Sequence, residues 1–326
     1  MKNKSPRLIF SLTGGLGNQL FQVAAAISLS GGEPVELEWG IGKPRLSRSG
    51  LPEVASFTLP NNVKLRKKVG GSWLMAKSSG YLLRMGIAPR TYEKLPMVKP
   101  VITALANLIS LAYFKEYRKS YAITGLGYSE VKAPPIKSFI VGYFQSFRWA
   151  SEPDTNKQLG SLSLRNRSTE VEEFQRLASV EKPLVVHIRL GDYKGESDFG
   201  LLHPDYYLEN ISDSWKSGKY QKIWIFSDEI ESAKKYFLDF EQNSLRYITE
   251  VDNSASATLE VMRYGHGFII GNSSFSWWGA YLAYAPDVEV NAPTPWFRNI
   301  ESPVDLIPPE WMLKAAKWRS LEDTLE

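Results

Sequence analysis

The chain has 326 residues, which suits two domains of about 150 residues each, and 43% of its residues are hydrophobic and 23% are charged. This composition is typical of a folded globular protein and excludes disorder, collagen and coiled coil. The chain has no cysteine and three histidines, which excludes disulfides, thiolate zinc sites and cysteine nucleophiles and makes histidine-rich metal sites unexpected.

The formal net charge of +4 is unevenly distributed along the chain. Residues 63–121 contain twelve Lys and Arg residues and two acids, so this segment carries +10 and the rest of the chain carries −6. Two interpretations stay open for the segment: a solvated basic face, or a surface that holds the protein peripherally on an anionic membrane. Its aromatic residues are not interleaved as in known nucleic-acid modules, so no nucleic-acid partner is expected.

Apolar runs in the chain are too short for export or membrane insertion. No run near the N-terminus matches a signal peptide, so a cytoplasmic location is expected. The uncharged, largely apolar stretch of residues 101–114 is shorter than the roughly 20 residues that span a bilayer and predicts a buried or interfacial helix.

The N-terminal half begins with one predicted βαβ unit. Residues 40–135 show no defined topology, and the polar segment 151–167 predicts the crossing between two domains, which we place at 1–155 and 156–326. The expected elements are a strand at 7–12, a helix at 19–30, and strands at 35–39 and 138–144.

The C-terminal half alternates strands and helices. This alternation predicts a parallel, doubly wound sheet, which binds ligands at the carboxyl ends of its strands. The expected strands are 184–189, 223–227, 245–248, 267–271 and 287–291, and the expected helices are 204–215, 229–237, 255–264 and 275–284.

A glycine-rich loop, Gly14-Gly15-Leu16-Gly17-Asn18-Gln19, joins the first strand to the first helix. Glycines let backbone N–H groups approach an anion at a helix N-terminus, and Asn18 and Gln19 add polar groups there. The loop lacks the third glycine of the dinucleotide-binding fingerprint. It is therefore either an anion site or a tight strand-to-helix turn.

His187 and Arg189 lie on the same side of a predicted strand that should be buried on both faces. An arginine at the carboxyl end of such a strand can hold a diphosphate, because its guanidinium stays charged and matches phosphate oxygens. The alternative is an ion pair between Arg189 and Asp192 that closes the turn. Glu196 and Asp198 follow in a polar loop and are either general bases toward a sugar hydroxyl or solvated acids.

The segment Gly271-Asn272-Ser273-Ser274-Phe275-Ser276 ends a predicted strand and opens a helix. Backbone N–H groups, hydroxyls and the helix dipole together are typical of a phosphate site, although the serines also suit ordinary N-caps. Trp277 and Trp278 are expected in the core. The chain has neither an Asp-x-Asp pair nor a GxxxxGK[ST] loop, so a bound diphosphate would be neutralised by arginine and helix termini, with no metal.

Four motifs together resemble, in this order, those of the α-1,2-fucosyltransferases of glycosyltransferase family 11. They are GGLGNQLFQ at 14–22, GYFQS at 142–146, HIRLGDY at 187–193 and NSSFSWWGA at 272–280. The resemblance implies an α/β, GT-B-like fold of two facing Rossmann-type domains with parallel sheets. It also implies an acceptor-side N-terminal domain, a C-terminal domain that binds GDP-fucose, an inverting mechanism and no required metal or cofactor.

By position, Arg189 is the first arginine of the family's His-x-Arg-Arg-Gly-Asp motif, which is expected to hold the donor's β-phosphate. Leu190 stands in place of the second arginine, and strand alternation predicts that it turns away from Arg189 and packs. Similarity to more distant fucosyltransferases implies that Asp192 orders the loop or Arg189, and that Asp252 reads the guanine edge.

The implied activity is transfer of L-fucose from GDP-fucose to the 2-hydroxyl of a terminal β-galactose in a surface or lipid-linked glycan such as O-antigen. The alternatives are a fucosyltransferase of another linkage and a nucleotide-sugar-binding module without catalysis. The predicted catalytic residues are Arg189, Asp192, Glu196 and Asp198. The predicted donor-binding residues are Gly15, Gly17, Asn18, Gln19, His187, Arg189, Asp252, Asn272, Ser273, Ser274, Phe275 and Ser276.

Overall fold

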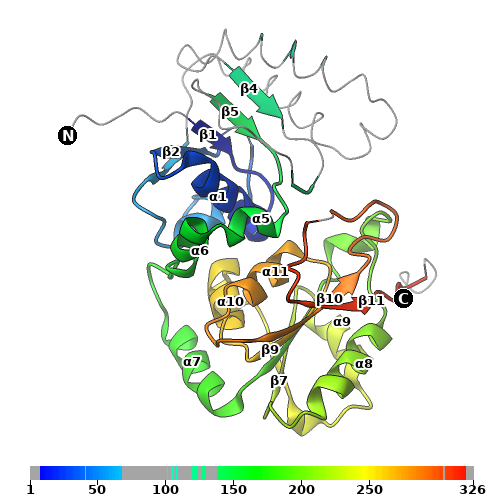
Figure 1. Cartoon of the computed structure of the whole chain (residues 1–326). Helices are drawn as coiled ribbons and strands as arrows, with labels where there is room; N and C mark the ends of the chain where they lie inside the picture. The colour runs from blue at the N-terminus through cyan, green and yellow to red at the C-terminus, as the bar shows by residue number, and fades with distance from the viewer. Residues whose placement is uncertain are drawn as a thin grey trace. The chain divides into compact units, whose positions relative to one another are not determined.

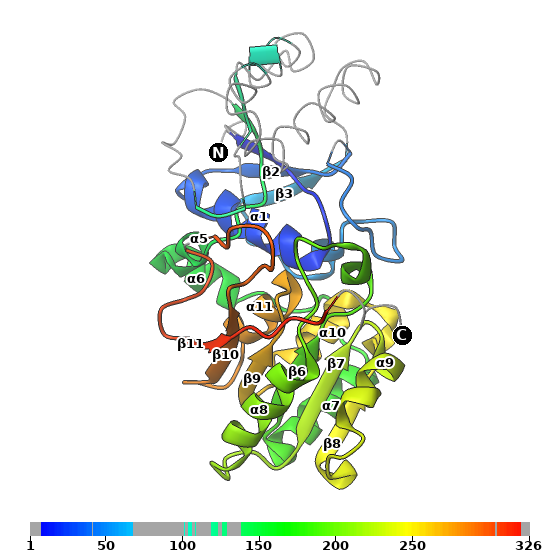
Figure 2. The ribbon, with the colours of Figure 1, turned by 90° about the vertical axis from the view of Figure 1, so that its right-hand side faces the viewer.

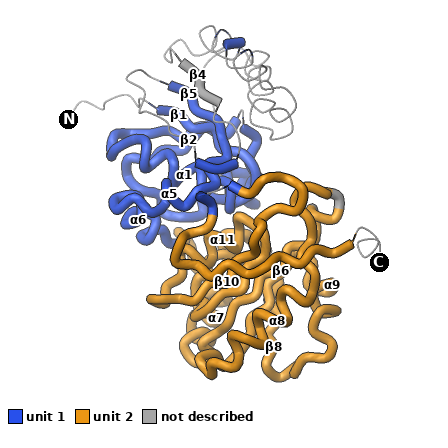
Figure 3. The backbone as a smooth tube through the Cα atoms, turned by 45° about the vertical axis from the view of Figure 1, so that its right-hand side comes forward, with its two compact units in different colours: residues 1–163, 303–306 blue, residues 164–302, 307–326 orange. Residues whose placement is uncertain are grey.

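The computed structural model describes residues 8–40, 42–67, 101, 104, 105, 108, 119–122, 126–128, 138–303 and 305–320. The chain divides into two compact units, Met1–Ser163 with Pro303–Leu306, and Leu164–Ser302 with Ile307–Glu326 (Figure 3). The prediction placed a single boundary after residue 155. In the structure the boundary follows Ser163, and a short segment near the C-terminus returns to the first unit.

The first unit contains a parallel sheet of five strands in the order β3-β2-β1-β5-β4 (Figure 1). The order reverses between β1 and β5, so the loops that follow these two strands flank a topological switch point, where doubly wound sheets bind ligands. The strands are β1 (Leu8–Ser11), β2 (Val35–Glu38), β3 (Val63–Arg66), β4 (Lys119–Ala122) and β5 (Ser138–Val141).

Helix α1 (Leu16–Ser30) packs on β1 and β2 and also contacts α5 (Phe147–Ser151) and α6 (Pro153–Gly160). It begins three residues before the predicted start, because Gly15 takes the N-cap position and Leu16 and Gly17 are already helical. A left-handed Gly31 ends the helix, as the glycine pair at 31–32 favours. The alanines and apolar residues of α1 are buried, so this helix packs its apolar side chains against the sheet.

The second unit contains a parallel sheet of six strands in the order β11-β10-β9-β6-β7-β8. Its order reverses between β6 and β9. Five of the strands confirm the predicted ones; β11 was not predicted, because it is an edge strand with exposed apolar side chains and no alternation of burial. The strands are β6 (Leu184–Ile188), β7 (Ile223–Ser227), β8 (Leu245–Ile248), β9 (Gly267–Ile270), β10 (Glu289–Thr294) and β11 (Met312–Ala315).

Helices cover both faces of this sheet (Figure 2). Val186 and Ile188 of β6 join one buried cluster with Tyr207 of α8 and Ala233 of α9, so helices α8 and α9 lie on that face. On the other face Trp224 contacts Phe174 of α7, with ring centroids 5.5 Å apart. The helices are α7 (Thr169–Glu181), α8 (Pro204–Trp215), α9 (Ile230–Lys234), α10 (Ala255–Met262) and α11 (Ser274–Tyr281).

The basic segment 63–121 begins and ends in the sheet of the first unit, as the two edge strands β3 and β4. Most of the segment, including most of the stretch 101–114 predicted as a helix, lies outside the described residues. Of that stretch Val101, Ala104, Leu105 and Leu108 are described, and all four are exposed. In the part of the chain that the structure describes, no helix has the length and apolarity to cross a bilayer.

Two α/β units, each built on a parallel sheet with helices packed against it, confirm the predicted GT-B-like fold class. Trp277 and Trp278 are fully buried, as expected. Each sheet has one point at which its strand order reverses, and the four sequence motifs follow the strands that flank these two points.

Candidate functional site

The switch point of the second unit brings two of the motifs together. Arg189 follows β6 directly, and Gly271 follows β9, which is paired with β6 in parallel. The Gly271 N–H donates a hydrogen bond to the His187 carbonyl, with a distance of 3.1 Å. The His-x-Arg motif and the serine-rich start of α11 therefore meet at one edge of the sheet, as the sequence predicted for a ligand site.

Arg189 is mostly buried and paired with a carboxylate. Its Nη1 lies 3.1 Å from Oδ2 of Asp228, and its guanidinium lies 5.8 Å from the centre of the Tyr193 ring. Among the described side chains, the carboxylate beside Arg189 belongs to Asp228, and the pairing of Arg189 with Asp192 stays a prediction. The Asp192 side chain lies outside the described part of the structure.

Asp228 is a residue that the sequence prediction missed. It follows β7, the neighbour of β6, and its carboxylate also accepts hydrogen bonds from the backbone N–H groups of Leu190, at 3.0 Å, and Gly191, at 3.1 Å. Its position directly after a predicted buried strand could have identified Asp228 as a site residue, because the carboxyl ends of parallel strands meet at one edge of the sheet. The same edge carries Arg189.

Leu190, which replaces the family's second arginine, is 2% exposed and packs in the core cluster between the sheet and α8. This confirms that it turns away from Arg189. The side chain of Leu190 therefore fills a core position.

His187 is buried beside α11. Its ring centre lies 5.7 Å from that of Phe275, and its Nδ1 has no hydrogen-bond partner among the described residues. Burial, and to a lesser degree the positive charge of Arg189, lower the pKa of His187 to about 3. The imidazole is therefore neutral at any physiological pH.

The depressed pKa of His187 predicts a pH dependence of stability. An unfolded histidine takes up a proton below about pH 6.5, whereas the folded one stays neutral until about pH 3. Stability should therefore fall as the pH drops through this window. In His187→Phe, unfolding free energy measured by denaturant titration should depend less steeply on pH between these values; the same slope in both proteins would contradict the assignment.

Several side chains at the start of α11 form hydrogen bonds within the helix N-terminus itself. Ser273 is the N-cap and accepts from the Phe275 N–H at 3.3 Å, which confirms the N-cap interpretation for this serine. The buried Ser276 hydroxyl donates to the Ser273 carbonyl at 3.1 Å. Ser274 is the first helical residue and is half-buried. A bound anion would thus meet the helix N-terminus chiefly through backbone N–H groups and Ser274.

Asn272 holds the loop that carries the predicted acids. Its side-chain amide donates to the carbonyls of Phe199, at 2.9 Å, and Gly200, at 3.2 Å. The Asp198 carbonyl accepts from the Arg298 N–H at 3.1 Å. Asp198 is half-buried, whereas Glu196 is exposed. The loop is therefore fixed at several points, and Asp198 is the more enclosed of its two acids.

Asp252 lies in the turn between β8 and α10, at the same edge of the sheet as Arg189 but at its outer strand. It is exposed and adopts a left-handed backbone with φ of 51°. Its N–H donates to a carboxylate oxygen of Glu170 at 3.1 Å, which ties the turn to α7. The structure thus places Asp252 at the edge formed by the carboxyl ends of the strands, and its role toward guanine stays a prediction.

The switch point of the first unit brings the other two motifs together. The Gln22 amide accepts from the Thr13 N–H at 2.9 Å and donates to the Gly142 carbonyl at 3.0 Å. The Gln145 amide donates to Oδ1 of Asn18 at 2.8 Å. The loops after β1 and β5 are therefore cross-linked by carboxamides.

The glycine loop is shaped by close contacts within this unit. Gly14 has φ of +72°, and a Cβ atom there would lie 2.5 Å from the Asn18 amide nitrogen, so only glycine fits. Gln19 is fully buried, and its amide donates to the Gly14 and Arg45 carbonyls and accepts from the Val54 N–H. Gln19 thus stabilises the turn, while Gly15, Gly17 and Asn18 lie at the start of α1.

Comparison with known proteins agrees with these motifs. The family model of glycosyl transferase family 11 matches residues 113–314. An alpha-1,2-colitosyltransferase of Escherichia coli is 26% identical over 314 residues, which cover 94% of this chain and 98% of that protein. The O-antigen biosynthesis glycosyltransferase WbnK of Escherichia coli is 33% identical over 118 residues, 35% of this chain and 39% of that protein.

Among solved structures, the fucosyltransferase NodZ from Bradyrhizobium is similar with a TM-score of 0.46 and 12% identity, over 86% of this chain and 94% of that one. Within the described residues no group of three or more His, Asp or Glu side chains is placed to hold a metal ion. The family match covers more than half of the chain, and the chain therefore belongs to glycosyl transferase family 11.

Proposed function

We propose that this glycosyltransferase moves L-fucose from GDP-fucose to the 2-hydroxyl of a terminal β-galactose in a surface glycan, with inversion at the anomeric carbon and without a required metal. The observation that carries the proposal is the position of Arg189, at the carboxyl end of β6 and at the switch point where α11 begins. This is where a doubly wound sheet binds a nucleotide, and a guanidinium there matches a diphosphate.

In the proposed reaction the acceptor oxygen bonds to the anomeric carbon of fucose as the bond to the β-phosphate oxygen breaks. Negative charge grows on the departing GDP, and Arg189 and the N-terminus of α11 stabilise it. Such preorganised charge stabilisation is commonly the largest catalytic contribution, on the order of 3 kcal/mol for one well-placed donor. The proton of the acceptor hydroxyl passes to a carboxylate of the loop after β6.

We assign the general base to Asp198, because its backbone is held by hydrogen bonds and it is half-buried, while Glu196 is exposed. Asp198→Asn should lower kcat by about 10²- to 10⁴-fold, and Glu196→Gln should leave kcat close to the wild-type value. Initial rates at saturating donor and acceptor compare the two variants. A large loss in Glu196→Gln with an active Asp198→Asn would transfer the role to Glu196.

A second donor deserves a direct comparison. The similarity to an alpha-1,2-colitosyltransferase extends over 94% of the chain, and colitose is the 3-deoxy analogue of fucose. A donor whose sugar lacks that hydroxyl is therefore the alternative to GDP-fucose. Either donor would use the same diphosphate contacts.

The experiment that tests the proposal is an acceptor screen with GDP-fucose and GDP-colitose in parallel, in buffer containing EDTA. We expect transfer from GDP-fucose to a β-galactoside, with an α-1,2 linkage in the product by NMR. A preference for GDP-colitose would assign that compound as the donor. Another linkage in the product would assign a different acceptor hydroxyl. GDP binding without transfer to any acceptor would favour a binding module, and loss of transfer in EDTA would contradict metal independence.

We further propose that the +10 charge of residues 63–121 holds the enzyme on an anionic leaflet in the cytoplasm, beside a lipid-linked acceptor. Each basic residue near such a surface contributes about 1 kcal/mol. The protein should float with vesicles that contain anionic lipid and should stay at the bottom with neutral vesicles. Equal flotation with both would leave the segment as a solvated basic face.

A further inference from the structure

We propose that Asp228 is a positioning residue, which orients the Arg189 guanidinium and thereby strengthens its binding to the donor diphosphate. The inference rests on the proposed function, because it assigns Arg189 to that diphosphate. Asp228 is in none of the four motifs, and it follows β7, whereas Arg189 follows β6.

Asp228 contacts both the Arg189 side chain and the backbone of the two residues that follow it. Oδ2 lies 3.1 Å from Nη1 of Arg189, while the same carboxylate accepts the N–H groups of Leu190 and Gly191, the two residues that follow. The carboxylate therefore fixes both the backbone after Arg189 and one end of its side chain. A guanidinium carries its five donors in a rigid fork, so holding one nitrogen restricts the directions that the other donors can take.

The sheet register explains why Asp228 meets these groups. β6 and β7 pair in parallel with Ile188 opposite Ser227, so Arg189 and Asp228 are the next residues of the two strands. The side chains of Arg189 and Asp228 are 18% and 25% exposed, which places the pair out of bulk solvent. Such a pair is screened less than a surface ion pair.

Gly191 is part of this arrangement. A Cβ atom on Gly191 would lie 2.6 Å from Oδ2 of Asp228, closer than such atoms can approach. The absence of a side chain at 191 thus allows the carboxylate to reach the backbone. Gly191→Ala should push the carboxylate away from Arg189 without removing either charge.

The alternative is that Asp228 only fastens the loop. A double-mutant cycle separates the two roles, because a residue that acts through Arg189 has no further effect once Arg189 is gone. The cycle compares wild type, Asp228→Asn, Arg189→Ala and the double variant by calorimetric titration with GDP. Asn keeps the size of the side chain and an oxygen that can accept one backbone N–H, but it loses the charge. Asp213→Asn is the matched control, since Asp213 is exposed and pairs with Lys216 on the same unit.

We expect Asp228→Asn to weaken GDP binding about 10-fold when Arg189 is present, which is within the range that a misplaced binding group produces. In the Arg189→Ala background the same substitution should not weaken binding. kcat with the donor found in the screen should fall in parallel, and Asp213→Asn should match wild type. Gly191→Ala should weaken GDP binding in the same Arg189-dependent way, and it takes over the test if Asp228→Asn does not fold.

Equal weakening in both backgrounds would show that Asp228 only fastens the loop and would overturn the inference. No weakening in either, or tighter binding when Arg189 is present, would overturn it as well. If wild type bound no GDP, the proposed function itself would fall and the inference with it. Failure of the inference alone is therefore recognised by GDP binding that is normal in wild type.

Discussion

Arg189→Ala should lower the transfer rate by about 10²- to 10³-fold, which is the loss typical when one preorganised donor to a developing negative charge is removed. Arg189 is the cation that the structure places at the carboxyl end of β6, beside the start of α11. The fold should survive, because Asp228 keeps its two backbone hydrogen bonds to Leu190 and Gly191. The measurement is kcat and donor KM by initial rates, together with the melting temperature.

Arg176→Ala is the matched control for this substitution, since Arg176 is exposed on α7 of the same unit. It should leave both kinetic constants unchanged. Arg189→Lys should recover only part of the activity, because an ammonium keeps the charge but loses the two-pronged fit to phosphate. Full activity in Arg189→Ala would contradict the assignment of Arg189 to the donor site.

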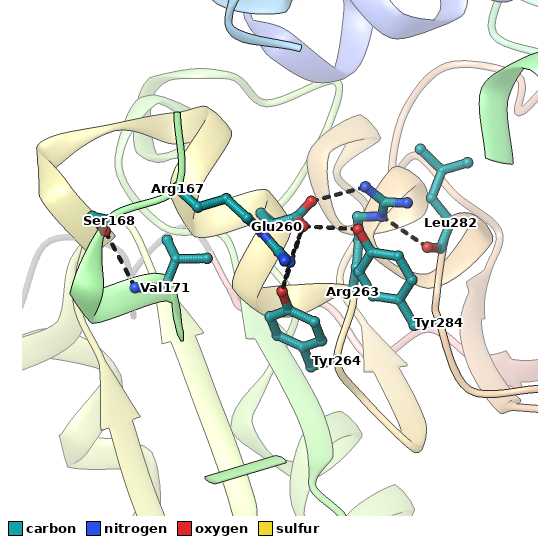
Figure 4. A network of polar contacts seen from close by, with 8 residues as sticks. All are labelled: Arg167, Ser168, Val171, Glu260, Arg263, Tyr264, Leu282 and Tyr284. Carbon is teal, nitrogen blue, oxygen red and sulfur yellow. Dashed lines mark hydrogen bonds and ion pairs between the residues drawn. The ribbon is translucent and has the colours of Figure 1, made fainter. Parts of the chain in front are cut away.

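Glu260→Ala should lower the free energy of unfolding by about 3–5 kcal/mol, the cost of leaving a buried charge without its partner. Glu260 is 0% exposed, and its carboxylate lies 2.8 Å from Nη1 of Arg263, whose side chain is 1% exposed (Figure 4). The same carboxylate binds Nη2 of Arg167 at 2.9 Å and accepts the Tyr284 hydroxyl at 2.7 Å. Denaturant titration measures the effect.

Glu231→Ala serves as the control, because Glu231 pairs with Lys234 on the surface of α9. Its loss should cost less than about 1 kcal/mol. Replacing Glu260 and Arg263 together with methionine should recover much of the stability, since no buried charge is then left alone. A Glu260→Ala protein as stable as wild type would mean that the network of Figure 4 contributes nothing to folding.

The network also explains how the start of α7 is held. Arg167 precedes the N-cap Ser168, and its guanidinium binds Glu260 of α10. Arg263 continues the chain of contacts by donating from Nε to the Leu282 carbonyl, just after α11. Three helices on one face of the sheet are thus joined around one carboxylate. We expect the loss in Glu260→Ala to appear as lower stability of this unit, with unchanged kcat in the folded protein.

The strands of the second unit were predictable because a central parallel strand is a short apolar run bounded by turn residues. Strands β7 and β8 begin and end at the predicted residues. Helix α8 does so as well, because His203 caps it and Pro204 begins it. Among the edge strands, β8 was predicted because it continues the regular alternation of strands and helices. The edge strands β3, β4 and β11 escaped prediction, since an edge strand needs no uniform apolar run and is defined by its partner.

The motifs themselves were visible in the sequence, and so was the position of each at a strand end. Membership of glycosyl transferase family 11 followed from the same motifs and is shown by the family match. The packing of Leu190 was predictable from alternation along β6. These features depend on residues that lie close together in the chain, where local spacing determines which way a side chain points.

Only the tertiary structure decided which groups meet. Asp228 lies 38 residues after Leu190 in sequence, and Glu260 lies 93 residues after Arg167, yet each pair is joined by a hydrogen bond or an ion pair. Such contacts depend on the order and register of strands and on how helices pack over them. Local patterns carry no information on either, because many strand orders bury the same apolar runs equally well. The sequence by itself therefore determined the family, the ends of several strands of the second unit and the position of Arg189 after β6. The fold determined which carboxylate lies beside Arg189.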